Sequence, residues 1–89
     1  MNNLLVEFLG SAFIIFIVLA LGDPLAIGVA LTLAILISKD ISGGHFNPIV
    51  TLAMTMVGKT SMKNLAPYIL AQTFGGLTAL ELFRRVLIL

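Results

Sequence analysis

Cysteine is absent from this 89-residue sequence, and histidine occurs once, as His45. Without cysteine the chain has no disulfide framework, no thiolate nucleophile and no thiol metal site. One histidine with four scattered carboxylates lacks the ligand number and spacing of a metal centre. The same side chains do not assemble a nucleophile, a base and an orienting group, so the sequence predicts neither an enzyme nor a cofactor site.

Charge is also scarce, because Lys, Arg, Asp and Glu make up only 10% of the residues and the net charge is +1. Such a chain gives no reason to expect nucleic acid as a partner. Hydrophobic residues make up 60% of the sequence and the mean hydropathy is +1.16, too apolar for a soluble domain of this size. The composition predicts a multi-pass integral membrane protein that contacts the lipid bilayer, most simply in a plasma or inner membrane.

Three apolar segments are candidates for membrane helices, at residues 4–21, 24–38 and 64–83. The first is near the lower length limit for crossing a hydrocarbon core about 30 Å thick, and the second is shorter still. No Lys or Arg precedes the first segment, whereas a secretory signal begins with a basic region. We therefore interpret it as a retained helix, with a cleaved signal ending near Ala20 as the alternative.

Residues 41–51 interrupt the apolar pattern between the second and third segments. Two glycines in this stretch allow irregular backbone, and Asn47-Pro48 is a typical helix start. Irregular backbone at membrane depth is tolerated only where it is buried in protein or lines a watery cavity. The sequence thus predicts a re-entrant loop over 41–47 and a half-helix over 48–57, whose positive N-terminal end faces that cavity.

Two polar residues inside the apolar segments are candidate functional residues. Glu7 is ionisable, and a charge within a span is expensive, so we expect a buried structural role; an interfacial position is the alternative. Gln72 carries an amide that must find hydrogen-bond partners if buried.

Three motifs then indicate a family. Residues 42–51, Ser-Gly-Gly-His-Phe-Asn-Pro-Ile-Val-Thr, closely resemble the first signature loop of the aquaporin and glycerol-facilitator family, the major intrinsic proteins. Residues 6–11 resemble the first-helix motif of that family, and residues 68–76 resemble its third-helix motif. The resemblance covers nearly the whole chain but only the amino-terminal half of the family's fold, which consists of two inverted three-span repeats.

The resemblance implies a channel for water or small neutral solutes such as glycerol. The implied fold is all-α, with three transmembrane helices and one re-entrant half-helix, so that residues 1–89 form a single aquaporin-like half-repeat. Asn47 would lie at the central constriction, and Gly43, Gly44, His45 and Phe46 would line the pore with a ladder of backbone carbonyl acceptors. The positive end of the half-helix would disfavour cations and protons.

The resemblance also implies roles for the residues that hold the loop. Glu7 would be the buried acceptor that fixes it, Gln72 a second brace, and Pro48 the rigid start of the half-helix. His45 would help to set the loop's shape; we favour a structural imidazole over a pH gate.

The sequence departs from the family pattern at three places. Ile49 stands where the signature usually has alanine, and a larger side chain there is expected to shift the half-helix or narrow the pore. Counting back from the signature places the second-helix selectivity position, usually aromatic, at Ile27. The segment joining Glu7 to Ser42 is shorter than usual, which puts Ile27 near the start of its helix.

The sequence holds one signature loop, without a second asparagine-proline loop or the selectivity arginine that follows it. A lone repeat leaves re-entrant backbone open to lipid, so we expect a cover. Our hypothesis is a homo-oligomer in which two copies pair antiparallel and their Asn47 side chains meet. The charge bias between the two ends is weak enough to permit both orientations, with Lys39, Lys59 and Lys63 on one side and Arg84 and Arg85 on the other. The alternatives are an inactive truncated remnant and a small structural membrane subunit.

Overall fold

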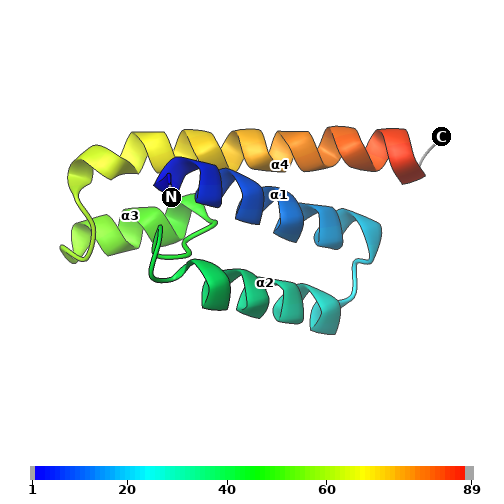
Figure 1. Ribbon diagram of the computed structural model, residues 1–89, viewed down its shortest axis with the longest axis horizontal. Helices are drawn as coiled ribbons and strands as arrows, with labels where there is room; N and C mark the ends of the chain where they lie inside the picture. Colours follow the sequence, from blue (N-terminus) through cyan, green and yellow to red (C-terminus); the bar gives the residue numbers. More distant parts are fainter. Residues whose placement is uncertain (1, 88–89) are drawn as a thin grey trace.

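The computed structural model describes residues 2–87, and all regular secondary structure in that range is helical. The elements are α1 (Asn3–Ala20), α2 (Pro24–Ser38), α3 (Pro48–Met56), the 3₁₀ turn η1 (Met62–Asn64) and α4 (Leu65–Leu87). Figure 1 shows α1 and α4 side by side, α2 returning antiparallel to α1, and the short α3 beneath the first part of α4. The molecule measures 43 × 23 × 23 Å.

Side-chain caps fix where the first two helices begin. The Asn2 side chain accepts hydrogen bonds from the backbone N–H groups of Leu4 (2.7 Å) and Leu5 (3.1 Å). This cap starts α1 at Asn3, one residue before the expected position. Asp23 caps α2 in the same way through the N–H of Ala26 (2.9 Å), with Pro24 at the first helical position.

The last helix differs most from the expected range of 64–83, since α4 continues to Leu87. Arg84 and Arg85 marked an expected interface, but neither residue breaks a helix. Both pair with Glu81 on the preceding turn, at 3.8 Å and 3.4 Å, and positive charge is favourable near a helix C-terminus. At its other end α4 begins after the η1 turn, which Ser61 caps.

Helices α1 and α4 form the most extensive contact in the described chain. Their close approach depends on Gly75, because a Cβ atom there would overlap the carbonyl oxygen of Phe8. Small residues at such crossings let membrane helices pack backbone against backbone. The α1–α4 pair therefore forms a rigid support to which the loop after α2 can be attached.

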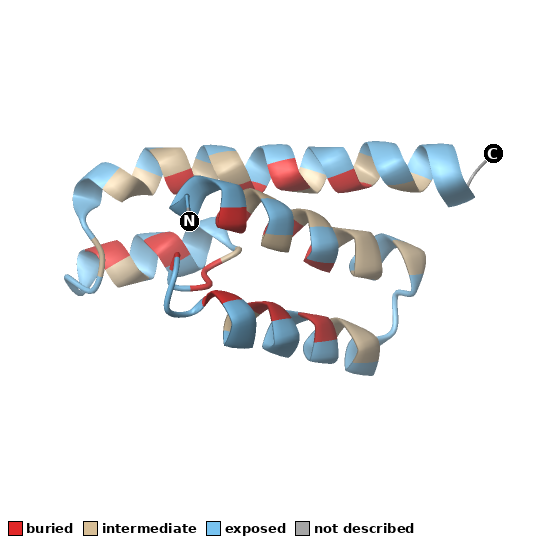
Figure 2. Ribbon diagram, viewed as in Figure 1, coloured by how far each residue is buried: buried red, intermediate tan, exposed pale blue. Residues whose placement is uncertain are grey.

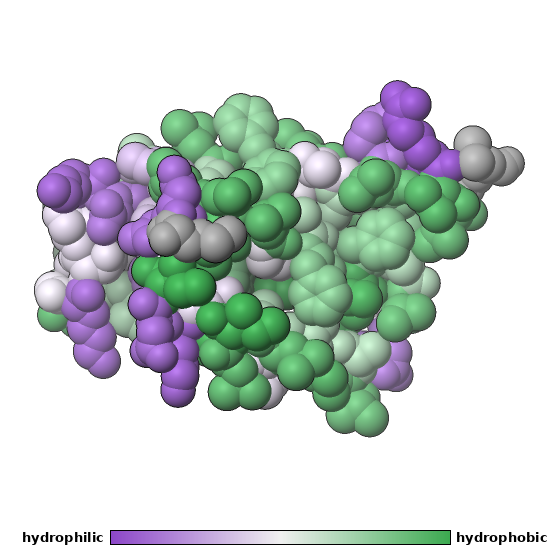
Figure 3. Space-filling model, viewed as in Figure 1, coloured by the Kyte–Doolittle hydropathy of each residue, from purple (hydrophilic) through white to green (hydrophobic). Residues whose placement is uncertain are grey.

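The distribution of polarity is inverted relative to a soluble protein. Large apolar side chains cover much of the outer surface, with polar side chains gathered toward the two ends (Figure 3). The buried residues, which lie on the facing sides of the helices (Figure 2), include more polar side chains than hydrophobic ones. An apolar exterior around a hydrogen-bonded polar interior suits a protein that is dissolved in lipid.

Within residues 2–87, α1 alone combines the length and the hydropathy of a membrane span. Helix α2 is apolar but has only 15 residues, and α4 has 23 residues but is more polar. The structure thus gives an all-helical fold with one clear span candidate. The number of crossings and the re-entrant placement of α3 remain predictions.

Candidate functional site

The irregular segment between α2 and α3 is held by a single buried carboxylate. Glu7 on α1 has no exposed surface, at 0%. Its Oε2 accepts hydrogen bonds from Ser42 Oγ (2.7 Å) and the backbone N–H of His45 (3.1 Å). Its Oε1 accepts from the N–H of Phe46 (2.8 Å) and from Gln72 Nε2 (2.9 Å). Glu7 thereby ties the loop to both α1 and α4.

A second junction lies at Thr51 on α3, which is also 0% exposed. Its hydroxyl accepts a hydrogen bond from Gln72 Nε2 (2.9 Å), lies 3.0 Å from His45 Nδ1, and donates to the carbonyl oxygen of Asn47 (3.3 Å). This hydroxyl connects the half-helix, the loop and α4 at one point. Thr51 was not predicted as a site residue, although it is the last residue of the signature stretch.

Tyr68 on α4 holds the start of the loop. Its hydroxyl donates to the carbonyl oxygen of Ser42 (2.7 Å), and its ring packs against that of His45 with centroids 5.2 Å apart. Ser42 and Tyr68 were not predicted as site residues. The signal that could have identified them is their position inside the first-loop and third-helix motifs.

The backbone donors and acceptors of the loop differ in how they are paired. The N–H groups of Gly43 and Gly44 bond Ser38 O (3.3 Å) and Ser42 Oγ (3.2 Å), and those of His45 and Phe46 bond Glu7. None of the four carbonyl oxygens of residues 43–46 accepts a hydrogen bond from residues 2–87. The backbone N–H groups of residues 43–46 are therefore all hydrogen-bonded within the described chain, whereas their four carbonyl oxygens remain available as acceptors.

The backbone conformation of the loop requires glycine at positions 43 and 44 and brings Phe46 into close contact with α1. Gly43 and Gly44 have φ of 95° and 64°, and a Cβ at Gly44 would lie 3.3 Å from Ile35 Cα. Phe46 also has positive φ, 54°, which is unusual for a residue with a bulky side chain. Its ring rests on Gly10, where any Cβ atom would overlap it. The position of the Phe46 ring thus depends on the absence of a side chain at Gly10 of α1.

Asn47 ends the loop and caps α3. Its Oδ1 accepts a hydrogen bond from the N–H of Ile49 (2.8 Å), which orients the amide and leaves Nδ2 without a partner in the described chain. Pro48 occupies the first helical position, and Asn47, Pro48 and Ile49 are all exposed. The α3 N-terminus therefore presents an amide donor at the positive end of a helix dipole.

These groups share a groove of about 400 Å³ with an apolar wall. Gly43, Gly44, His45, Phe46 and Asn47 contribute the polar side; the remaining lining residues are Ile14, Ile15, Leu31, Ile35, Val50 and Met54. The structure thus brings together five of the six residues predicted to line a pore.

The sixth residue, Ile27, does not line this groove. It lies half-exposed in the first turn of α2, on the face that Leu31 and Ile35 continue four and eight residues later. Leu31 and Ile35 were not predicted as lining residues. Their four-residue spacing from Ile27 was the available signal.

Comparison with known families gives this arrangement a context. The family model described as major intrinsic protein matches residues 1–88. This chain belongs to the major intrinsic protein family. Major intrinsic proteins are membrane channels rather than enzymes, which agrees with a site built from backbone carbonyls, an amide and an apolar wall.

Individual relatives within the family match only in part. The chain is 43% identical over 88 residues to "Glycerol uptake facilitator protein-like 6" of Lactiplantibacillus plantarum, with 89% of this chain and 41% of the relative covered. It is 44% identical over 92 residues to "Aquaporin-8" of Notomys alexis (91% and 35%), and 38% identical over 95 residues to "Aquaporin Z" of Brucella melitensis (89% and 41%). The chain therefore spans less than half the length of these relatives. No solved structure gives a significant match.

Proposed function

We propose that this chain forms one wall of a transmembrane channel for water or small neutral solutes such as glycerol. The observation that carries the proposal is the groove. Its lining combines apolar side chains with residues 43–47, and the carbonyls of residues 43–46 and Asn47 Nδ2 have no hydrogen-bond partner within residues 2–87. Membership of the major intrinsic protein family and relatives named as aquaporins and a glycerol uptake facilitator support it.

The groove offers a passing molecule a replacement for its hydration. Loop carbonyls accept hydrogen bonds from it, and Asn47 Nδ2 donates one. The aliphatic wall has no hydrogen-bonding groups, so a passing molecule bonds only to the loop and Asn47. Each of these hydrogen bonds is then easily exchanged for the next one. The positive end of α3 disfavours cations and protons near Asn47. In this proposal Glu7, Gln72 and Pro48 act on permeation indirectly, by holding the loop and the half-helix.

We further propose that a second copy of the chain, inverted in the membrane, supplies the facing wall and brings its own Asn47 to the centre. The groove is not enclosed by residues 2–87, and the N-terminal end of α3 is exposed, with Ile49 69% exposed. Lipid chains cannot donate hydrogen bonds to unpaired backbone carbonyls, so exposing these carbonyls to lipid is unfavourable. A second polar loop provides a more favourable environment for them. The weak charge bias between the two ends permits both insertions.

Permeation is tested by reconstituting the chain in liposomes and following osmotic shrinkage by light scattering, first with an impermeant solute and then with glycerol. We expect liposomes that contain the natural chain to shrink faster than empty liposomes. Liposomes that contain Asn47→Ala are expected to shrink no faster than empty ones. Asn2→Ala is the matched control, because Asn2 caps α1 just as Asn47 caps α3 but lies outside the groove. Equal loss in both variants would assign the effect to helix capping and would contradict the channel role of Asn47.

Antiparallel pairing is tested separately by labelling Gly58→Cys with a membrane-impermeant thiol reagent. The natural chain has no cysteine, so the introduced thiol is the only target. We expect labelling from both faces of the membrane. Labelling from one face alone would contradict antiparallel pairing. The channel proposal would still stand if permeation appeared once an inverted repeat was supplied on a separate chain.

A further inference from the structure

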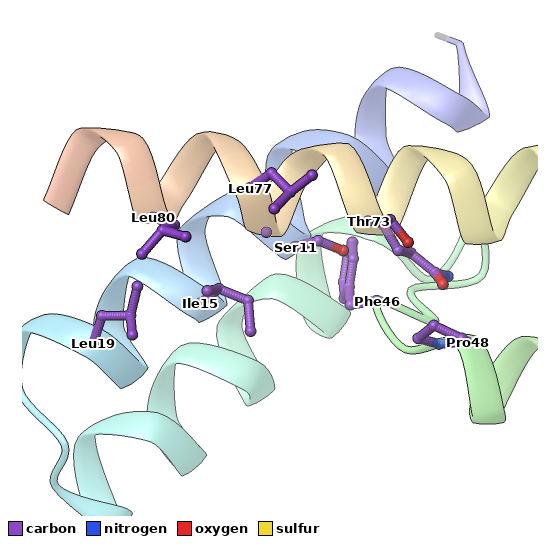
Figure 4. A pocket seen from close by; sticks show the side chains of 10 residues that line it. Ser11, Ile15, Leu19, Phe46, Pro48, Thr73, Leu77 and Leu80 are labelled. Atoms are coloured by element: carbon purple, nitrogen blue, oxygen red, sulfur yellow. The ribbon is translucent and has the colours of Figure 1, made fainter. Parts of the chain in front are cut away.

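Two buried oxygen atoms lack a hydrogen-bond partner within residues 2–87, Ser11 Oγ on α1 and Gln72 Oε1 on α4. Ser11 is 2% exposed and Gln72 is 5% exposed. Both residues line one pocket of about 400 Å³ between α1 and α4 (Figure 4). Buried polar atoms in folded proteins are almost always paired, so this pocket has two unmet requirements.

The orientation of the Gln72 amide is fixed by its donors. Nε2 uses its two hydrogens on Glu7 Oε1 and Thr51 Oγ1, both at 2.9 Å. A reversed amide would place oxygen against the Glu7 carboxylate, acceptor against acceptor. Oε1 is therefore the amide atom that is left without a hydrogen-bond donor within residues 2–87.

Ser11 differs from the threonines that lie within helices elsewhere in the chain. Thr32, Thr55, Thr73 and Thr78 each donate to the carbonyl oxygen four residues earlier, at 2.7–2.8 Å. The Ser11 hydroxyl makes no such bond to Glu7 O. Its hydrogen is therefore free for an acceptor in the pocket.

We propose that one ordered water molecule occupies the pocket, accepts a hydrogen bond from Ser11 Oγ and donates one to Gln72 Oε1. Water is small and carries both donors and acceptors, so a single molecule can pair with both atoms. Thr73 also lines the pocket, and its hydroxyl, which donates to Ile69 O, keeps acceptor capacity for the second hydrogen. Three polar partners are typical of a buried water.

This site is distinct from the groove of the proposed channel. Only Phe46 and Ile15 of the residues lining the pocket also line the groove. Figure 4 shows Phe46 near Ser11, and the ring of Phe46 rests on Gly10, the residue before Ser11. The bound water would be a structural component that completes the chain from Ser11 through Gln72 to Glu7 and the loop. The inference holds whether or not the groove conducts.

Magic-angle-spinning NMR of the isotope-labelled chain in liposomes tests this site. The measurement is magnetisation transfer from water to the Gln72 side-chain amide hydrogens, made at acidic pH where direct exchange is slow. We expect transfer in the natural chain, its loss in Ser11→Ala and its retention in Thr78→Val. Thr78 is the matched control, since its helical hydroxyl does not line the pocket.

Three results would overturn the proposal. Transfer absent from the natural chain excludes the water, and this result stands even if Ser11→Ala fails to fold. Transfer unchanged in folded Ser11→Ala means that Ser11 does not hold the water. A contact from Gln72 Oε1 to a protein hydrogen of a second chain means that a side chain, not water, fills the pocket.

Discussion

The two sides of the loop over residues 42–47 differ in almost every respect. On the scaffold side, amide hydrogens, hydroxyls and the Gln72 amide converge on Glu7 and Thr51, both fully buried. On the groove side, four carbonyls and the Asn47 donor have no partner in residues 2–87. The first side satisfies its polar groups and fixes the loop. The second leaves them available for a passing molecule, so stability and permeation are predicted to depend on different residues.

The largest expected effect is on the scaffold side, from Glu7→Gln. An amide cannot accept from all four donors that now surround the carboxylate, and each lost bond to a charged group is worth about 1.5–3 kcal/mol. We expect a large fall in thermal stability in detergent, measured by circular dichroism, together with loss of permeation. A stable Glu7→Gln protein would show that the carboxylate does not hold the loop.

A pair of glycine substitutions separates loop contacts from general helix effects. Gly10→Ala places a methyl group in the ring of Phe46, so we expect destabilisation of about 1–3 kcal/mol, typical of overpacking. Gly28→Ala has nothing within 4 Å of its new methyl group and removes a glycine from a helix, so we expect stabilisation of about 0.5–1 kcal/mol. Equal changes in melting temperature for the two variants would contradict the close Phe46–Gly10 contact.

A loss of stability similar to that of Gly10→Ala is expected for Thr51→Val, which keeps the shape of the side chain. The substitution leaves one hydrogen of Gln72 Nε2 unpaired, at a cost of about 1–3 kcal/mol. Thr55→Val is the matched control on the same helix face, because the Thr55 hydroxyl bonds only the carbonyl of Thr51 (2.8 Å). A greater loss in Thr55→Val than in Thr51→Val, by chemical denaturation, would argue against Thr51 as a junction.

The smallest stability change is expected on the groove side, from Leu31→Ala. Leu31 is exposed, so little packing is lost in Leu31→Ala. The shorter side chain widens the groove, because Leu31 is part of its apolar wall. We expect faster glycerol entry into liposomes with little change in water permeability or melting temperature. Leu36→Ala is the control, since Leu36 is also exposed on α2 but does not line the groove. Identical glycerol rates in the two variants would remove Leu31 from the pore wall.

Sequence could predict the local features of the site because their causes are local. The two glycines gave an irregular segment, and Asn47-Pro48 gave the helix start; the structure shows φ of 95° and 64° and a capped α3 at these positions. Only the family resemblance suggested that Glu7 holds the loop, and its partner Ser42, 35 residues away, was not predicted. Counting back from the signature placed Ile27 in the pore wall, whereas Leu31 and Ile35 line the groove in the structure. The count fixes a position in the sequence but not how deep that residue lies along α2.

The roles of Thr51 and Ser11 were not predicted, for another reason. A threonine in a helix usually donates to its own backbone, as Thr51 and four other threonines here do. What sets Thr51 and Ser11 apart depends on helix packing, since Thr51 also accepts a hydrogen bond from Gln72 and Ser11 Oγ has no partner within residues 2–87. The extension of α4 to Leu87 was missed because charge at Arg84 and Arg85 indicates a water interface, whereas a helix can continue through one.

The most direct test of the central claim is Asn47→Asp, measured for liposome permeability and melting temperature on the same preparation. Aspartate caps a helix as well as asparagine does, so the scaffold side is kept, but the Nδ2 donor is replaced by a negatively charged oxygen. We predict a melting temperature like that of the natural chain and a clear fall in osmotic shrinkage. Unchanged shrinkage in the stable variant would contradict the claim that the open side of the loop forms the wall of a channel.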